Sequence, residues 1–336
     1  MLMFVLRRTV MVLPTLFGLL VLTFLFTHIF PSDPSAALAG DNATPAQIQE
    51  IRRQYGFDRP VYSQFLIYLR QVAQGNLGTS IYTQRPVSED IAHRLPATLE
   101  LTFVALLIAA GIGIPLGVIS GFAYNTWLDY LLRVLSVGGL AIASFWLAIM
   151  FQLLFSMHLA WLPLRGRLDI GSALPPSLTG FYLLDSLFTG RLAIFWDALK
   201  HIVLPAVTLA IAALATILRF TRSGVLETLQ RDFVTYEIAA GYRRRAIVWK
   251  YVLRNSIISA VTQVGLLFSS MIAGAVAVEA IFDWPGIGSY AVGAILGSDY
   301  NAMMAVTLVV GVTYAFVNIA VDVLHALIDP RLLEHM

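Results

Sequence analysis

Long runs of apolar residues dominate the pattern along the chain, separated by short stretches in which the charged residues gather. Six runs free of Asp, Glu, Lys and Arg approach or exceed the roughly 20 residues that a helix needs to cross a bilayer. They cover residues 9–30, 101–125, 134–164, 201–218, 255–278 and 301–321. None shows the ten-residue alternation of apolar and polar positions that is typical of membrane β-strands. The pattern predicts an all-α polytopic membrane protein with six transmembrane helices.

The longest polar interval, residues 31–96, separates the first two predicted spans. It contains six arginines and six acidic residues, which is a balanced, water-facing composition. Residues 47–54 and 61–72 have the periodicity of short amphipathic helices, and Gly75-Asn76-Leu77-Gly78 is typical of a turn. We therefore expect three parts: residues 1–30 with the first helix, a small periplasmic subdomain over 31–96, and a core domain over 97–336 with the other five helices.

Basic residues beside the spans predict the orientation. Arg7 and Arg8 directly precede the first span, and cytoplasmic flanks are enriched in Lys and Arg. Six crossings then place the interval 219–254 in the cytosol together with both termini. That interval carries eight of the 22 basic residues and three acids. The two signals agree on N- and C-termini in the cytosol of a multi-pass inner (cytoplasmic) membrane protein.

Composition supports a lipid-facing surface and excludes several classes of protein. The 336 residues are 58% hydrophobic and 12% charged, about half the charge of an ordinary soluble domain. The absence of cysteine excludes disulfides and thiol catalysis. A net charge of +2 makes a nucleic-acid partner unexpected.

The chain lacks the sequence signals of its own ATP site, of a catalytic nucleophile and of a metal site. A P-loop needs Gly-Lys followed by Ser or Thr, but Lys200 follows Leu199 and Lys250 follows Trp249, and these are the two lysines of the chain. No Gly-x-Ser-x-Gly elbow occurs. No two of the six histidines lie three or four residues apart, so no helical histidine pair is available for a metal. We expect no catalytic residue, no metal and no cofactor on this chain.

Glu100 and Glu279 fall near the ends of spans, where a carboxylate is expected to be solvated or paired. The nearby sequence Trp284-Pro285-Gly286-Ile287-Gly288 predicts a turn, because Pro fixes φ and Gly permits a sharp reversal. Two roles stay open for Glu279, Trp284, Pro285, Gly286 and Gly288: a structural turn, or a gate or docking element at the outer end of span five.

A compact helical element is predicted within the interval 222–254. Residues 230–240 are compatible with a short helix in which Asp232, near the start, is favourable for the helix dipole. Gly241 then supplies a left-handed C-cap, and residues 242–253 form a basic helical stretch that runs into span five. The alternative is a basic loop that only neutralises anionic lipid headgroups.

This interval resembles the "EAA" coupling loop of ABC-importer permeases, in its peptide-transporter form. Four positions match the pattern D-Y-V-x-T-A-R-A-K-G: Asp232, Val234, Ala239 and Gly241, with Phe233 in place of the aromatic Tyr. Tyr236, Glu237, Ile238 and Ala240 depart from it. Further fragments match the same family in order, and they include Gly75–Gly78, residues 94–101, residues 113–117, residues 161–163, residues 284–288 and Asp299-Tyr300.

Over its whole length the chain resembles the B-type permease subunit of the dipeptide/oligopeptide ABC importers. The resemblance implies the type I ABC-importer permease fold and a heterodimeric pore formed with a homologous C-type permease. It also implies two cytosolic ATPase subunits that carry ATP and Mg, and a periplasmic substrate-binding protein. The expected coupling-loop residues are Asp232, Phe233, Val234, Glu237, Ala239, Gly241 and Arg243.

Other functions remain to be weighed against a peptide importer. The same machinery could carry a nickel chelate, glutathione, an opine or an antimicrobial peptide, because selectivity in this family resides largely in the binding protein. A stand-alone secondary transporter is disfavoured by spans almost free of charge, and a membrane enzyme by the lack of paired catalytic residues within a span.

Overall fold

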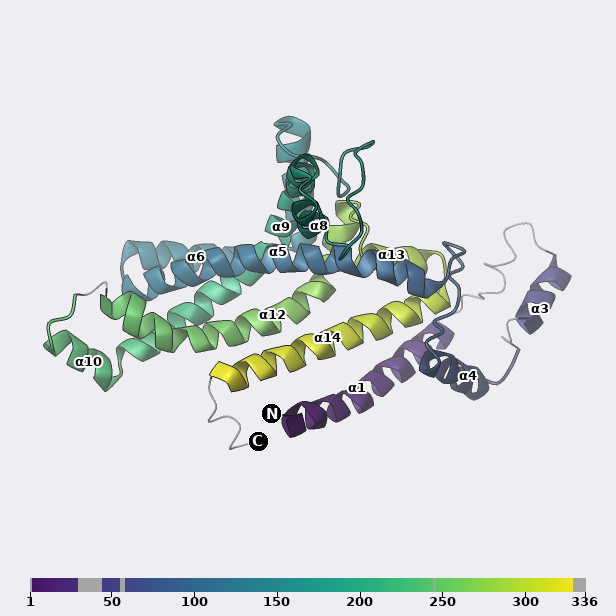
Figure 1. Ribbon diagram of the computed structural model, residues 1–336, viewed down its shortest axis with the longest axis horizontal. Helices are drawn as coiled ribbons and strands as arrows, with labels where there is room; N and C mark the ends of the chain where they lie inside the picture. The colour runs from purple at the N-terminus through teal and green to yellow at the C-terminus, as the bar shows by residue number, and fades with distance from the viewer. Residues whose placement is uncertain (1, 30–43, 55–57, 244–245, 329–336) are drawn as a thin grey trace. The chain divides into compact units, whose positions relative to one another are not determined.

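The computed structural model describes residues 2–29, 44–54, 58–243 and 246–328, and they are almost entirely helical (Figure 1). Within these ranges the β-structure is limited to an isolated bridge between Thr79 and Pro86. The chain divides into two compact units: residues 1–97 with 285–315, and residues 98–284 with 316–336. Two helices, α5 (Val87–Phe122) and α14 (Tyr300–Ile328), each contribute to both units.

The first unit consists of α1 (Leu2–Ile29), α3 (Pro45–Gln54), α4 (Val61–Ala73), α13 (Ile287–Leu296) and the nearer parts of α5 and α14. The ring centroids of Phe24 on α1 and Phe65 on α4 lie 5.0 Å apart, and both residues contact the cluster around Met304 of α14. The helices α3 and α4 confirm the two short amphipathic helices predicted between the first spans. The predicted turn is also present, since Gly75 and Gly78 have φ of +76° and +80°.

Asp299 joins two parts of the first unit. Its side chain is fully buried, and Oδ1 accepts the backbone N–H of Ala302, which caps the N-terminus of α14. Its other oxygen, Oδ2, accepts the Ser80 hydroxyl at 2.5 Å and the Tyr82 N–H at 3.2 Å. One carboxylate therefore holds the segment that carries the β-bridge against the start of α14.

The second unit is built around α9 (Leu192–Leu229), which contacts α6 (Trp127–Ala141), α7 (Ser144–Phe151), α8 (Tyr182–Phe188) and α12 (Leu253–Ile281). Pro205 lies inside α9, where it removes one helical hydrogen bond. After α9 come α10 (Asp232–Ala239) and the π-helix η2 (Ile247–Val252), which continues into α12. In Figure 1, α10 lies at the opposite end of α9 from α8.

Within the described residues, five helices are long and apolar enough to cross a membrane, and a bent pair brings the number to six if it counts as one span. The third predicted span, 134–164, was expected to be one helix, and this is wrong. The structure instead has α6 followed by α7 and the π-helix η1 (Gln152–His158), at an angle of 98°. Ile142 and Ala143 take up extended backbone at the break, just after Gly138-Gly139, where helix propensity is low.

The predicted polar interval 219–254 begins inside a helix. In the structure α9 continues through Arg219, Arg222 and Glu227 to Leu229, so charge ends the apolar run but not the helix. Arg231, the N-cap of α10, pairs with Glu227 of α9 at 3.0 Å, so this exposed ion pair spans the turn between the two helices.

Candidate functional site

The helix α10 ends in a well-formed cap. Gly241 has φ of +80°, and its N–H donates to the carbonyl of Ile238 at 3.0 Å. The next N–H, of Tyr242, donates to the carbonyl of Glu237 at 3.2 Å. These two bonds make a Schellman motif, which satisfies the last carbonyls of the helix. The predicted short helix and its left-handed glycine cap are both confirmed.

One face of α10 attaches it to the rest of the second unit. Val234 is 1% exposed and packs in a cluster with Val118 of α5, Val225 of α9 and Val252 of η2. Phe233 is half-buried against the same cluster. Because four elements meet at this cluster, α10 is held on a base formed by the ends of α5 and α9.

Other side chains of α10 and of the turn after it are exposed, and they include large apolar and aromatic ones. Tyr236 is 73% exposed, Ile238 is 61% exposed and Tyr242 is 50% exposed. Asp232, Ala239 and Arg243 are exposed beside them. Glu237 is half-buried, and among the described residues its Oε2 has no hydrogen-bond partner. A protruding apolar surface with a charged rim is suited to a protein partner.

Below α10, the helices α5 and α9 are in very close contact. Gly113, Gly117 and Gly121 recur every four residues on α5 and face Ile217, Thr221 and Val225 on α9. A Cβ on Gly117 would lie 2.6 Å from the Cβ of Thr221 and 2.8 Å from the carbonyl oxygen of Leu218. Small residues at this spacing let helix backbones approach each other, as in membrane helix pairs.

A buried ion pair fixes the same end of the unit. Asp129 on α6 is fully buried and receives Arg222 of α9 at both oxygens, with Nε–Oδ1 at 2.7 Å and Nη2–Oδ2 at 3.0 Å. The hydroxyl of Ser120 on α5 donates to Asp129 at 2.7 Å. The bidentate geometry gives direction as well as attraction, so α5, α6 and α9 are held together one turn before the base of α10.

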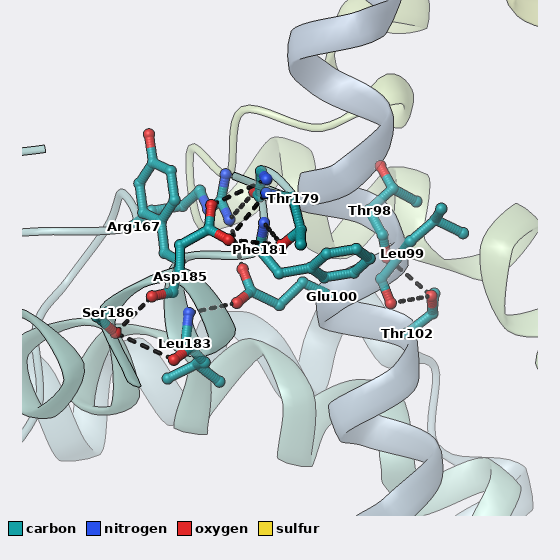
Figure 2. Close-up of polar contacts among 12 residues, drawn as sticks. Thr98, Leu99, Glu100, Thr102, Arg167, Thr179, Phe181, Leu183, Asp185 and Ser186 are labelled. Atoms are coloured by element: carbon teal, nitrogen blue, oxygen red, sulfur yellow. Dashed lines mark hydrogen bonds and ion pairs between the residues drawn. The ribbon is translucent and has the colours of Figure 1, made fainter. Parts of the chain in front are cut away.

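At the other end of the unit, Glu100 of α5 is buried and receives two groups from the segment 165–190 (Figure 2). The Arg167 guanidinium donates to Glu100 Oε2, and the N–H of Leu183 donates to Oε1 at 2.7 Å. The carbon at the centre of the guanidinium also lies 3.5 Å from the ring centroid of Tyr182. The planar guanidinium of Arg167 can donate hydrogen bonds and stack on an aromatic ring at the same time, which the compact ammonium group of a lysine could not do.

Asp185, in the same segment, organises the loop before α8 (Figure 2). It accepts the N–H groups of Leu178, Thr179 and Gly180 and the hydroxyl of Thr179. Burial alone would raise the pKa of Asp185, but these hydrogen bonds to its charged form outweigh burial and lower the pKa below its usual value. The loop is therefore held by an ionised carboxylate at neutral pH.

Comparison with known proteins covers nearly the whole chain. Residues 113–334 match the family described as "Binding-protein-dependent transport system inner membrane component". Residues 1–102 match the family described as its N-terminal membrane component. The chain belongs to this family of transport permeases.

Three relatives show the range of names within the family. The permease is 44% identical to a probable D,D-dipeptide transport system permease protein of Escherichia coli K12, over 94% of this chain and 93% of that protein. It is 38% identical to a di/tripeptide transport system permease protein of Pseudomonas aeruginosa, over 99% of each. It is also 34% identical to a glutathione transport system permease protein of Escherichia coli O6:H1, over 99% of each.

The second group of predicted site residues is divided between the two units of the permease. Glu279 and Trp284 belong to the second unit and are buried there. The hydroxyl of Thr98 donates to Glu279 at 2.6 Å, and the N–H of Trp284 donates to the carbonyl of Glu279 at 2.9 Å. Glu100 and Glu279 are thus paired, which was one of the two expected outcomes, and both side chains are buried.

The predicted turn is present, but its left-handed residue is Asp283 at φ +49° and not Gly286. Gly286 has φ of −101° with an extended ψ and serves as the N-cap of α13 in the first unit. Pro285 is exposed, whereas Gly288 is buried within α13. Asp tolerates the left-handed region better than most residues, which is why the reversal does not need the glycine.

Several structural residues of the permease were missed by the sequence prediction. The stripe Gly113-x-x-x-Gly117-x-x-x-Gly121 is visible in the sequence and was available as a packing signal. The pairs Asp129–Arg222 and Glu100–Arg167 join residues 93 and 67 positions apart, and no local signal connects them. The structure also gathers Asp169, Asp197 and His201, which a search for histidine pairs does not find.

Proposed function

We propose that this permease is the B-type subunit of an ATP-driven importer of di- and oligopeptides. It would form half of a translocation pore with a homologous C-type permease. The proposal is supported by relatives that match over nearly their full length and are named for dipeptide and di/tripeptide transport.

The helix α10 is the proposed seat of energy coupling. The observation that carries this proposal is that Val234 and Phe233 pack into the base, while Tyr236 and Ile238 of the same short helix protrude. A short helix held in this way can transmit a displacement between a partner and the ends of α5 and α9. The partners are two ATPase subunits that bind ATP and Mg, and this chain is the non-catalytic membrane subunit.

The proposed orientation follows the positive charge. Arg7 and Arg8 before the first span put both termini and α10 in the cytosol of a bacterial inner membrane. The segments 31–96 and 165–200 then face the periplasm, where a substrate-binding protein would dock.

Glutathione is a second candidate cargo, because a relative named for glutathione transport is 34% identical over 99% of both chains. Glutathione is itself a small peptide, so the same pore could serve either cargo. The measurement that separates the two candidates is the ligand affinity of the binding protein that operates with this permease.

One pair of variants tests the coupling surface. Ile238→Glu places a charge among the exposed apolar side chains of α10, and Ile170→Glu makes the same change at an isoleucine that is fully exposed in the loop after η1. Burying an unpaired carboxylate at a protein interface is costly. We expect Ile238→Glu to lower co-purification of the ATPase and transport by about tenfold or more, and Ile170→Glu to leave co-purification of the ATPase near wild type. Full ATPase binding and transport by Ile238→Glu would contradict the proposed docking face.

A further inference from the structure

Three potential metal ligands meet at the end of α9 that is far from α10. Asp197 and His201 lie one turn apart on α9, and Asp169 comes from the loop that follows η1. One ligand atom from each residue lies within 4.8 Å of the other two. At 1.5 Å per residue, the cluster is about 40 Å along α9 from the base of α10, so it is separate from the proposed coupling surface.

The hydrogen bonding of His201 fixes which ring nitrogen is available. The imidazole is buried, and Nδ1 lies 2.9 Å from the backbone carbonyl oxygen of Asp197. A carbonyl oxygen can only accept, so Nδ1 carries the proton. The lone pair of a neutral His201 ring is then on Nε2, which lies 3.6 Å from Asp169 Oδ1. Metal-bound histidines are commonly oriented in this way, by a second-nitrogen N–H donated to a carbonyl.

The carboxylate of Asp197 is oriented by other groups. Its Oδ2 accepts the Ser172 hydroxyl at 2.8 Å and the backbone N–H of Asp169 at 3.2 Å. Its Oδ1 is 3.2 Å from His201 Nδ1. In the part of the chain that the structure describes, neither Asp169 nor Asp197 forms an ion pair with Lys or Arg. Two carboxylates therefore lie beside one imidazole, Asp169 at Nε2 and Asp197 at Nδ1, without a fixed cation between them.

We propose that Asp169, Asp197 and His201 bind a divalent transition-metal ion. Its protein ligands would be His201 Nε2 and one carboxylate oxygen from each aspartate, with water completing the coordination. One nitrogen and two oxygens suit borderline ions such as Zn²⁺ or Mn²⁺, whereas Ca²⁺ and Mg²⁺ prefer sites made of oxygen alone. The ion would hold the loop that carries Asp169 against the first part of α9. Its ligand His201 lies four residues before Pro205.

The competing explanation is that His201 bridges the two carboxylates with no metal. Both explanations satisfy the 3.6 Å separation between Nε2 and Asp169. They predict different results when a divalent metal is added at neutral pH, because only a metal site binds one ion per chain.

Zinc titration of the purified full-length permease, with its partner subunits and without a histidine tag, separates them. We expect isothermal titration calorimetry to show one Zn²⁺ per chain that is lost or weakened by about 100-fold in His201→Gln. Asp169→Asn, at an exposed loop position, should weaken binding by about tenfold without a risk to folding. His158→Gln removes an exposed histidine elsewhere in the same unit and should leave the affinity unchanged.

Two results would overturn the proposal. One is the absence of stoichiometric Zn²⁺ binding to the wild-type permease at micromolar concentrations, with Mn²⁺ giving the same result. The other is equal affinity in wild type, His201→Gln and Asp169→Asn. Either would leave the cluster as a set of hydrogen-bonded side chains without a metal. A positive result does not depend on the coupling role of α10, because the readout is metal binding and not transport.

Discussion

At the scale of single residues, the second unit depends on a few buried charges. Glu100 and Arg167 are both almost fully buried and bonded to each other, and Glu100 also accepts the N–H of Leu183. A buried pair is weak evidence of net stability, because desolvation opposes the attraction. Removal of one partner is different, since it leaves the other charge buried and unpaired.

Glu100→Gln should therefore destabilise the permease strongly, by about 3–5 kcal/mol in the free energy of unfolding. The double variant Glu100→Gln/Arg167→Met, which removes both charges, should recover much of that loss. The measurement is the thermal unfolding midpoint in detergent, followed by tryptophan fluorescence. A double variant no more stable than Glu100→Gln would show that the arginine has a role beyond neutralising this carboxylate.

At the scale of elements, the contact between α5 and α9 positions the base of α10. Gly117 and Gly121 bring α5 so close to α9 that a Cβ would be within 2.6 Å of a side-chain atom. Gly111, on the same helix, has no atom within 4 Å of such a Cβ. The two positions share a residue type and a helix and differ in what they face, so they form a matched pair.

Gly117→Ala should lower the free energy of unfolding by about 1–3 kcal/mol, because the added methyl group overpacks the contact with Thr221 and the backbone of Leu218. Gly111→Ala should be neutral or slightly stabilising, since alanine is the better helix former by about 1 kcal/mol. Chemical unfolding in detergent compares them. Equal effects at the two positions would mean that α5 and α9 do not approach as closely as described.

The sequence predicted elements better than it predicted the contacts between them. Apolar runs and the capping glycine are local signals, so α10, Gly241 and the helices between the first spans were found. The break at Ile142–Ala143 was missed because an apolar run has the same composition whether the helix continues or turns. Asp129 and Arg222 were missed as partners because pairing over 93 residues depends on the packing of α6 against α9.

At the scale of the whole molecule, the absence of cysteine makes the membrane orientation directly measurable. Tyr236 on α10 and Ile170 near α8 are both exposed. Tyr236→Cys should react with a membrane-impermeant maleimide only after the inner membrane is opened, whereas Ile170→Cys should react in intact cells. The cysteine-free parent is the blank. The reverse pattern would invert the proposed topology, and reaction of both in intact cells would contradict the assignment of α10 to the cytosol.

Pro205 is a point at which the long helix α9 can bend. A proline weakens the backbone locally, so bending of a long helix concentrates there. The 24 residues of α9 that follow Pro205, up to Leu229, contain no second proline and span about 36 Å. A change of about 10° at Pro205 would therefore displace the base of α10 by about 6 Å. Bending of α9 at Pro205, one turn after His201, would therefore move the base of α10.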